Sequence, residues 1–268
     1  MNLELRSPVN ERVAIQVPKE VSNLAKPFNG SLCSQEGDEY SVINNIIDIL
    51  GKSPDFTSIA QSTNHWKLTA SIYEDIWRKR SLTLLSGEDF PIEKEHELLI
   101  EWTAPKPNGL YLDFGCSTAL YGRALKASQP EAQIVGLDFS SQMLNEARLK
   151  AEADETNMFL VRADGRDLPF FSKTFDGIVM GGTLNELTEE LKVLYEARRV
   201  IKNDGVFFMM HLIKSDVWYG RLLQESIGLG GIKFWTVDES NKLFKQAGFR
   251  IESQLVRGIV CFTKLVPN

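Results

Sequence analysis

The stretch that decides the fold is LYLDFGCSTALYG, residues 110–122. Mostly apolar residues lead into Asp113, Gly115 and a cluster of small residues, a pattern typical of a buried strand that breaks into a tight turn and then a helix. Turns of this kind often hold a nucleotide-like ligand. A dinucleotide requires the spacing G-x-G-x-x-G, because its pyrophosphate lies directly against the backbone. Ser117 and Leu120 stand where the second and third glycines would be, which argues against NAD or FAD.

The composition is that of an ordinary globular protein, with 268 residues, 43% of them hydrophobic and 25% charged. The net charge of −6 argues against a surface that coats nucleic acid. No apolar run reaches the roughly 18 residues of a membrane span, and the start MNLELRSPVN is not a secretory signal. The cysteines Cys33, Cys116 and Cys261 lie far apart, so we expect no disulfide framework and a cytoplasmic location.

From residue 110 onward, strand and helix patterns alternate regularly. Strands are predicted over residues 110–114, 133–138, 158–162, 175–180 and 205–211, and helices over about 120–128, 141–153, 188–200 and 237–247. This alternation predicts a mostly parallel sheet with right-handed crossovers. The last two β-like runs, RIESQLV and IVCFTKLV, have only RG between them and predict an antiparallel hairpin.

The chain is expected to have three parts. Residues 1–60 hold short β-like runs broken by Pro, Gly, Asn and Ser and predict a small β-rich module. Residues 61–104 carry helical periodicity, including IEKEHELLIEW at 92–102, and predict a helical lid or linker. Residues 105–268 form the predicted α/β domain.

Over about residues 105–265 the sequence resembles the class I S-adenosylmethionine-dependent methyltransferases, in their methyltransferase type 11 group. The motifs that carry the resemblance, in chain order, are LDFGCSTA, IVGLDFSSQMLNEA, FLVRADGRDLPFFSKTFDGIVM and EARRVIKNDGVFFM. It implies an enzyme of α/β class with a Rossmann-like sheet of seven strands, mostly parallel with an antiparallel terminal hairpin. The cofactor that it implies is S-adenosylmethionine, which has no phosphate and is expected to tolerate the small residues Ser117 and Ala119. A positive φ at either would strain the backbone.

Three aspartates, Asp113, Asp138 and Asp164, fall at or just after predicted strand ends, which places them along one rim of the sheet. The Asp138 carboxylate is expected to accept hydrogen bonds from both hydroxyls of a ribose. The alternative for any one of these aspartates is that it caps a helix or forms a turn. Phe139, next to Asp138, is expected to stack on the adenine, and Asp113 is expected to organise the loop and, through water, the methionine amine. Asp164 resembles the acid of the family that takes the adenine amino group. The complete expected cofactor set is Asp113, Gly115, Ser117, Asp138, Phe139, Met143, Asp164, Gly165, Gly181 and Tyr73.

The expected catalytic residues are His211, Asn185 and Glu186. His211 ends a predicted strand, and a neutral imidazole there is able to deprotonate a hydroxyl near its ordinary pKa of about 6.5. The alternative is a partly buried histidine that is held by hydrogen bonds. Asn185 lies in GGTLNELTE, where many relatives have a His, and is able to orient an acceptor. Glu186 beside it is the second candidate for the base.

The N-terminal part resembles a branch of the same family that carries a zinc ribbon. ASIYEDIWRKR, residues 70–80, resembles the helix that closes over the cofactor there, so Tyr73 and Trp77 form either a lid or part of a core. LRSPVNERV and SLCSQEGDEYSVINNIIDIL resemble the two halves of the ribbon, but Ser7 and Asn10 replace the first ligand pair and only Cys33 remains of the second. Tetrahedral zinc needs four ligands, so no metal is expected. The module is expected to pack through Val42, Ile43, Ile46, Ile47 and Ile49.

Three functions remain open from the sequence. The first is methylation of a small, apolar or aromatic molecule in small-molecule metabolism, with O-methylation preferred and an aromatic cavity formed by Trp218, Tyr219, Phe234 and Trp235. The second is an RNA base methyltransferase, because a zinc-ribbon relative methylates a guanine of ribosomal RNA; the acidic balance makes a nucleic-acid partner unlikely. The third is a cofactor-binding partner subunit that has lost catalysis. The oligomeric state does not follow from the sequence.

Overall fold

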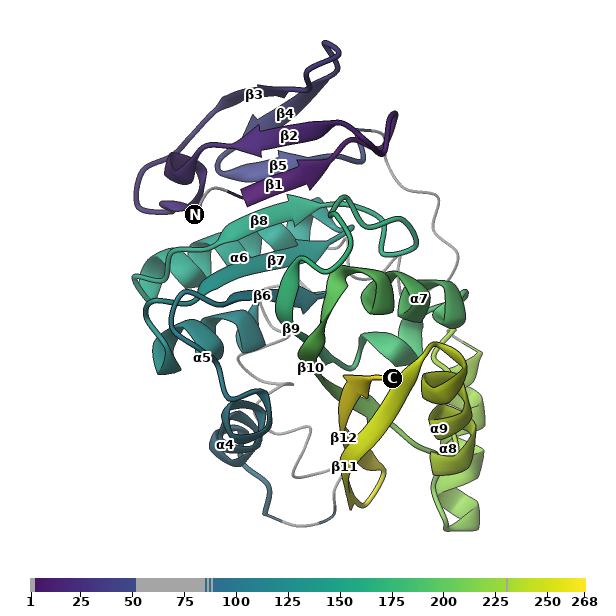
Figure 1. The fold of residues 1–268 in the computed structure, drawn as a ribbon. Helices are drawn as coiled ribbons and strands as arrows, with labels where there is room; N and C mark the ends of the chain where they lie inside the picture. The colour runs from purple at the N-terminus through teal and green to yellow at the C-terminus, as the bar shows by residue number, and fades with distance from the viewer. Residues whose placement is uncertain (1–2, 52–84, 86, 88, 230) are drawn as a thin grey trace.

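A computed structural model describes residues 3–51, 85, 87, 89–229 and 231–268 (Figure 1). The strands are β1 (Leu3–Arg6), β2 (Ala14–Val17), β3 (Gly30–Cys33), β4 (Glu39–Ile43), β5 (Ile46–Asp48), β6 (Leu110–Phe114), β7 (Gln133–Asp138), β8 (Phe159–Arg162), β9 (Phe175–Gly181), β10 (Ile201–Leu212), β11 (Phe249–Arg257) and β12 (Val260–Pro267). The helices are α4 (Ile92–Thr103), α5 (Leu120–Ser128), α6 (Ser141–Ala153), α7 (Glu190–Val200), α8 (Trp218–Gly228) and α9 (Val237–Gln246), with 3₁₀ turns η1 (Lys19–Ser22) and η3 (Thr183–Glu186). None of the helices in these residues is both long and apolar enough to cross a membrane.

The centre of the molecule is a twisted sheet in which β8, β7, β6, β9, β10, β12 and β11 lie side by side in that order. The strands from β8 to β10 pair in parallel, and β12 pairs antiparallel with both β10 and β11. The predicted α/β class and Rossmann-like, mostly parallel sheet with an antiparallel terminal hairpin are therefore confirmed. The reversal of strand order at β6 places the carboxyl ends of β6, β7 and β9 around one crevice.

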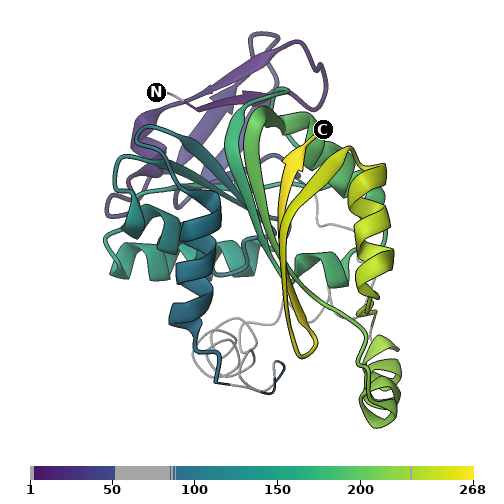
Figure 2. The same ribbon diagram turned by 60° about the horizontal axis from the view of Figure 1, so that its bottom comes forward.

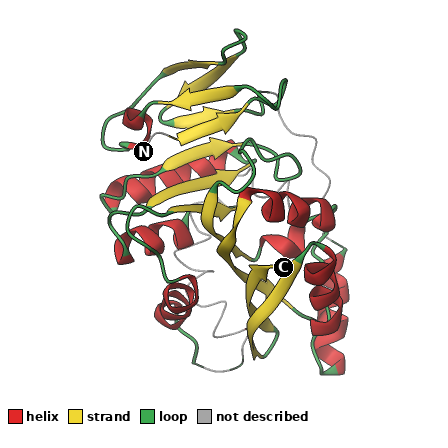
Figure 3. Ribbon diagram, in the orientation of Figure 1, coloured by secondary structure: helices red, strands yellow, loops and turns green. Residues whose placement is uncertain are grey.

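Helices cover both faces of this sheet (Figures 2 and 3). On one face α4, α5 and α6 pack against the sheet through Leu99, Leu125 and Leu144, all fully buried. On the other face α7 and α9 bury Leu194 and Phe244 in a second apolar cluster. Both faces of the parallel strands are thus covered, which explains why those strands are almost continuously apolar.

Strands β3 to β5 of the N-terminal module continue the sheet, whereas β1 and β2 pair with each other in a separate sheet of two strands. Strand β5 pairs in parallel with β8, and β4 and β3 follow as an antiparallel extension, so these three strands extend the predicted seven-stranded sheet to ten strands. Val42 and Ile47 are buried in the same core as the central strands, whereas Ile43 is 61% exposed and does not contribute to this packing as predicted. Figure 1 shows the module beside β8. The predicted boundary at residue 60, and Tyr73 and Trp77 of the predicted lid, lie outside the described residues.

Hydrogen bonds shape the two turns that correspond to the predicted zinc-ribbon turns. The hydroxyl of Ser7 accepts from the amides of Val9 and Asn10 at 3.2 and 3.3 Å and contacts the Tyr40 hydroxyl at 3.2 Å. In the second turn the corresponding acceptor is Ser34, whose hydroxyl accepts from the amides of residues 36 and 38. Cys33, next to it, is exposed. Among the described residues no group of His, Cys, Asp and Glu side chains is arranged to hold a metal ion.

Replacing Ser7 with Ala should lower the free energy of unfolding by about 0.5–1.5 kcal/mol, because it removes the hydrogen bonds that the buried Ser7 hydroxyl makes in this turn. Ser31→Ala is the matched control, since Ser31 is exposed on β3. Urea titrations of both variants, with and without a chelator, measure the effect. A Ser7→Ala protein as stable as the control, or a chelator that lowers the stability of the parent protein, would contradict this account of the turn.

Candidate functional site

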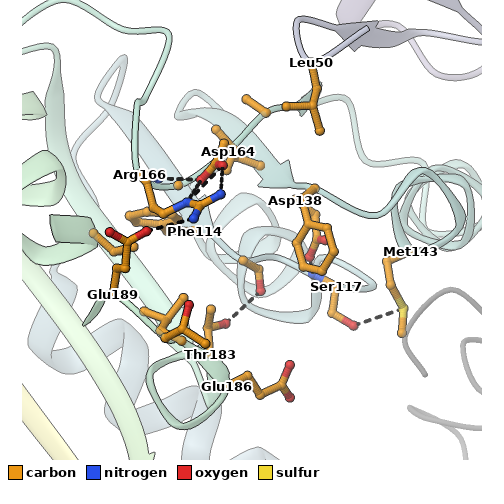
Figure 4. A pocket seen from close by; sticks show the side chains of 18 of the residues that line it. Leu50, Phe114, Ser117, Asp138, Met143, Asp164, Arg166, Thr183, Glu186 and Glu189 are labelled. Carbon is orange, nitrogen blue, oxygen red and sulfur yellow. Dashed lines mark hydrogen bonds and ion pairs between the residues drawn. The ribbon is translucent and has the colours of Figure 1, made fainter. Parts of the chain in front are cut away.

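A pocket opens at the carboxyl ends of the central strands, and it encloses about 1070 Å³ with its open mouth included (Figure 4). The described residues that line it are Leu50, Phe114, Gly115, Ser117, Leu137, Asp138, Phe139, Met143, Ala163, Asp164, Gly165, Arg166, Gly181, Thr183, Glu186, Leu187, Thr188, Glu189 and Val193. Eight of the ten expected cofactor residues are therefore together in one pocket. Asp113 lines a smaller hollow that shares Gly115, Ser117 and Gly181 with the pocket, and Tyr73 lies outside the described residues.

The loop after β6 forms the floor of the pocket by taking left-handed backbone conformations. Gly115 has φ of 66°, and a Cβ there would lie 2.5 Å from the Thr183 side chain, so no larger residue fits. Ser117 and Ala119 also have positive φ, 50° and 57°. These are the two positions at which the sequence analysis anticipated strain if φ were positive. The loop thus keeps the shape of a glycine-rich turn although only its first position is Gly.

The carboxylate of Asp138 lies buried at the end of β7 and connects three segments. One oxygen accepts from the Ser117 amide and the other from the Ser140 amide, both at 2.9 Å. Burial raises the pKa of Asp138, and these backbone hydrogen bonds oppose part of that rise. Each carboxylate oxygen can accept more than one hydrogen bond, so the backbone donors fix its orientation without exhausting it.

Asp164, after β8, is held by an arginine that the sequence analysis did not single out. The Arg166 guanidinium donates to both oxygens of Asp164 and pairs with Glu189 at 2.8 Å. Burial alone would raise the pKa of Asp164, but the hydrogen bonds and the charge of Arg166 outweigh burial and lower it. The one signal in the sequence for this ion pair was the short spacing between Asp164 and Arg166. The Asp164 carboxylate therefore faces the pocket in a fixed orientation, and Arg166 is shared between it and Glu189.

Asp113 organises the start of α5. The residue before that helix is Ala119, which has no side-chain oxygen to cap the first turn. The carboxylate of Asp113, on β6, accepts instead from the Gly122 amide at 2.8 Å. Asp113 thus anchors the helix that follows the pocket loop.

Of the three expected catalytic residues, only Glu186 lines the pocket. Asn185 points away from the pocket and joins β10 to the segment near residue 233. Its amide donates to the carbonyls of Leu212 and Lys233 at 2.8 and 2.6 Å, and its oxygen accepts from the Leu212 amide at 2.8 Å. The side chain is almost fully used and only 3% exposed, so its geometry is that of a structural clamp and not of a group that orients a substrate.

His211 is not among the described residues around the pocket, which corrects the expectation that it faces the substrate. Its imidazole is fully buried and meets the ring of Phe244 edge to face at 5.7 Å. Neither ring nitrogen has a hydrogen-bond partner among the described residues. Burial lowers the pKa of His211 to about 4, so it stays neutral at pH 7 and would not give a rate that rises through pH 6.5.

The aromatic residues of the segment before α9 do not form the cavity that the sequence suggested. Trp218 and Tyr219 begin α8 and are 76% and 63% exposed. Trp235 packs beside the core of the α7 face. The pocket instead takes apolar lining from Leu50, a residue of the N-terminal module for which the local sequence gave no signal.

Comparisons with known proteins identify the chain's relatives. The model of a methyltransferase domain family matches residues 112–205. The chain is 32% identical to the demethylmenaquinone methyltransferase of Staphylococcus carnosus, over 70% of this chain and 81% of that protein. It is 25% identical to an uncharacterized chloroplastic methyltransferase of Arabidopsis thaliana, over 89% of this chain and 71% of the relative. It spans about half the length of several other quinone methyltransferases that it matches.

Solved structures share the fold. A SAM-dependent methyltransferase from Aquifex aeolicus superposes with a TM-score of 0.59 at 21% identity, over 75% of this chain and 97% of that one. At this identity the likeness concerns the fold. The likeness covers nearly the whole chain of that structure.

Because the folded protein resists protonation of His211, its stability should depend on pH. Unfolded histidine titrates near 6.5 and His211 near 4, so stability present above pH 6.5 should fall as the pH drops toward 4, by up to about 3 kcal/mol. His211→Gln should lose this component. The measurement is the free energy of unfolding of the parent and of His211→Gln from pH 8 to pH 4. The difference between the two proteins at each pH reports His211 alone, because the contributions of the other histidines cancel. Parallel profiles would contradict the burial of an unpaired, neutral imidazole.

Proposed function

This chain belongs to the class I S-adenosylmethionine-dependent methyltransferases, and we propose that it methylates a small apolar or aromatic metabolite, preferentially at a hydroxyl oxygen. It is an enzyme, and its cofactor is S-adenosylmethionine. The observation that carries the proposal is the composition of the pocket, in which carboxylates outnumber cations beside a wall of apolar residues. The quinone substrates named for several relatives agree with an acceptor of this kind.

The residues of the pocket fit this cofactor. We assign the ribose hydroxyls to the Asp138 carboxylate, whose orientation is fixed by the amides of Ser117 and Ser140. Phe139 and Met143 supply apolar surface, and Asp164 supplies an acceptor for an amino group. The absence of a glycine at position 117 suits a ligand without a pyrophosphate. When bound, the cofactor supplies a methyl group on a sulfonium that needs no further activation, so alignment and exclusion of water are the main tasks left to the protein.

The charges around the pocket favour a neutral acceptor over RNA. Asp138, Asp164, Glu186 and Glu189 line it, and the one described cation among the lining residues is Arg166. Arg166 is engaged by Asp164 and Glu189. Binding of nucleic acid depends on cations that are able to neutralise phosphates, and this rim offers the opposite charge.

We assign the base to Glu186, which lies at the end of η3 on the pocket wall, because His211 and Asn185 are directed elsewhere. A hydroxyl acceptor must lose its proton as the methyl group arrives. A carboxylate within hydrogen-bond reach of that hydroxyl takes the proton, and the neutral acid then releases it to solvent. In this proposal Glu186 also orients the acceptor oxygen toward the methyl group.

Asp138→Ala should weaken the binding of S-adenosylhomocysteine, the demethylated cofactor, by about 1–3 kcal/mol, because polar groups of the ligand lose their buried partner. Isothermal titration calorimetry measures this directly. Asp154→Ala is the control, since Asp154 follows α6 away from the pocket and pairs with Arg123 on the surface. Equal affinities of the two variants would remove Asp138 from the cofactor site.

The function is tested by incubating the protein with methyl-labelled cofactor and three kinds of acceptor: hydroquinones and phenols with apolar tails, fractionated metabolites, and ribosomal RNA. We expect label in the small-molecule fraction, and mass spectrometry with NMR distinguishes methylation at oxygen from methylation at carbon. Label in RNA alone would overturn the proposal. Binding of cofactor with no turnover on any acceptor would favour a subunit without catalysis.

With an acceptor in hand, Glu186→Gln should lower turnover about a hundredfold or more, because the amide is unable to accept the proton. The affinity for S-adenosylhomocysteine should change little, since the proposed contact of Glu186 is with the acceptor. Glu189→Gln is the matched control on the same wall. Near-normal turnover of the Glu186 variant would contradict the assignment of Glu186 as the base and would indicate that catalysis depends on alignment of the substrates.

A further inference from the structure

We propose that the N-terminal module completes the cofactor pocket: Leu50 forms the wall at the adenine end, and Asp48 and Arg162 are positioning residues that hold this wall and the Phe139 segment together. The proposal rests on the cofactor orientation given under the proposed function, in which Asp138 receives the ribose and Asp164 the adenine amino group. It assigns to the module a direct part in cofactor binding.

Strand pairing brings these residues into one row. Arg162 is the partner of Asp138 in the β7–β8 pair and the partner of Asp48 in the β5–β8 pair. Both pairs are parallel, so all three residues lie at the same edge of the sheet, the edge where the pocket opens. The module is thus registered directly against the strand end that carries the proposed ribose ligand.

Arg162 joins the two sides of this row. Its Nη1 donates to the Asp48 carboxylate at 2.8 Å, and its Nε donates to the Phe139 carbonyl at 3.1 Å. The side chains of Arg162 and Asp48 are only 10% and 20% exposed, so water screens the pair less than it screens a surface ion pair. A guanidinium is able to hold two partners in a fixed geometry, whereas a lysine ammonium at this position is not.

The turn after β5 places Leu50 at the pocket. The other oxygen of Asp48 accepts from the Gly51 amide at 2.9 Å, and the Ile49 amide donates to the Arg162 carbonyl at 3.0 Å. Leu50 lies between these two anchored amides and lines the pocket. Figure 4 shows its side chain on the same side of the pocket as Asp164.

The surroundings of Leu50 suit a flat heteroaromatic ring. Leu50, Leu137 and Ala163 are apolar lining residues, and Phe139 adds an aromatic ring to the same pocket. Apolar walls with a few polar groups at the edge are the usual composition of such sites, and Asp164 supplies the polar edge. Loss of Arg162 or Asp48 would release the Phe139 segment or the Leu50 turn without removing any contacting side chain.

The test is the affinity for S-adenosylhomocysteine, measured by calorimetry on the full chain and its variants. Leu50→Ala should weaken binding about tenfold, because it removes a buried apolar contact. Asp48→Asn and Arg162→Lys should each weaken binding about three- to tenfold. In the double variant, Asp48→Asn should add little to the effect of Leu50→Ala, because both substitutions act on the same wall. Amide hydrogen exchange at Phe139 and Ser140 should be faster in Arg162→Lys.

Asp176→Asn is the matched control. Asp176, on β9, pairs with Lys202 at 2.8 Å and accepts from the Leu110 amide at 2.9 Å, so it duplicates the Asp48 arrangement at the opposite edge of the sheet. It should lower the melting temperature comparably and leave the affinity unchanged. If Asp48→Asn and Arg162→Lys behave like this control, and Leu50→Ala binds like the parent, the inference is overturned. Because the readout is binding, failure to methylate any acceptor would overturn the proposed function alone.

Discussion

The amides of Ser117 and Ser140 both donate to the buried carboxylate of Asp138, and the geometry of the pocket depends on this pair of hydrogen bonds. They tie the loop after β6 and the start of α6 to the end of β7. A buried carboxylate without such donors would be costly and would tend to take up a proton. Burial raises the pKa of Asp138, and the backbone hydrogen bonds offset part of that rise. The site therefore keeps an acceptor that is oriented in advance and still has capacity for ligand hydroxyls.

The N-terminal module also contributes to the stability of the sheet. Strand β8 would be an exposed edge without β5, and pairing with β5 protects it while it buries Ile47 in the main core. Two turns of the module are held by the hydroxyls of Ser7 and Ser34. The module thus contributes to the fold through strand pairing and, as we propose, to the pocket through Leu50.

Two of the expected catalytic residues were misplaced for reasons that only packing decides. Along β10 successive side chains alternate between the faces of the sheet: Phe208 and Met210 face α4 and α5, whereas Phe207, Met209 and His211 belong to the side of α7 and α9. His211 therefore meets Phe244, because the period of two assigns it to that face. Asn185 and Glu186 are neighbours in sequence, yet the η3 turn directs one into a hydrogen-bonded clamp and the other onto the pocket wall.

The sequence by itself determined the order and type of the central elements and the rim of carboxylates at the strand ends. The predicted bounds of β6, β7, α5 and α6 match the structure, because strong apolar periodicity and nearby glycines and caps specify these elements locally. The tertiary structure alone decided the pairing of β5 with β8, the burial of His211, the joining of Arg166 to Asp164, and the place of Leu50 in the pocket. The pairing of β5 with β8, the contact of His211 with Phe244 and the place of Leu50 depend on segments far apart in the chain, and the Arg166–Asp164 pair depends on how one loop folds. Local periodicity does not specify these partners.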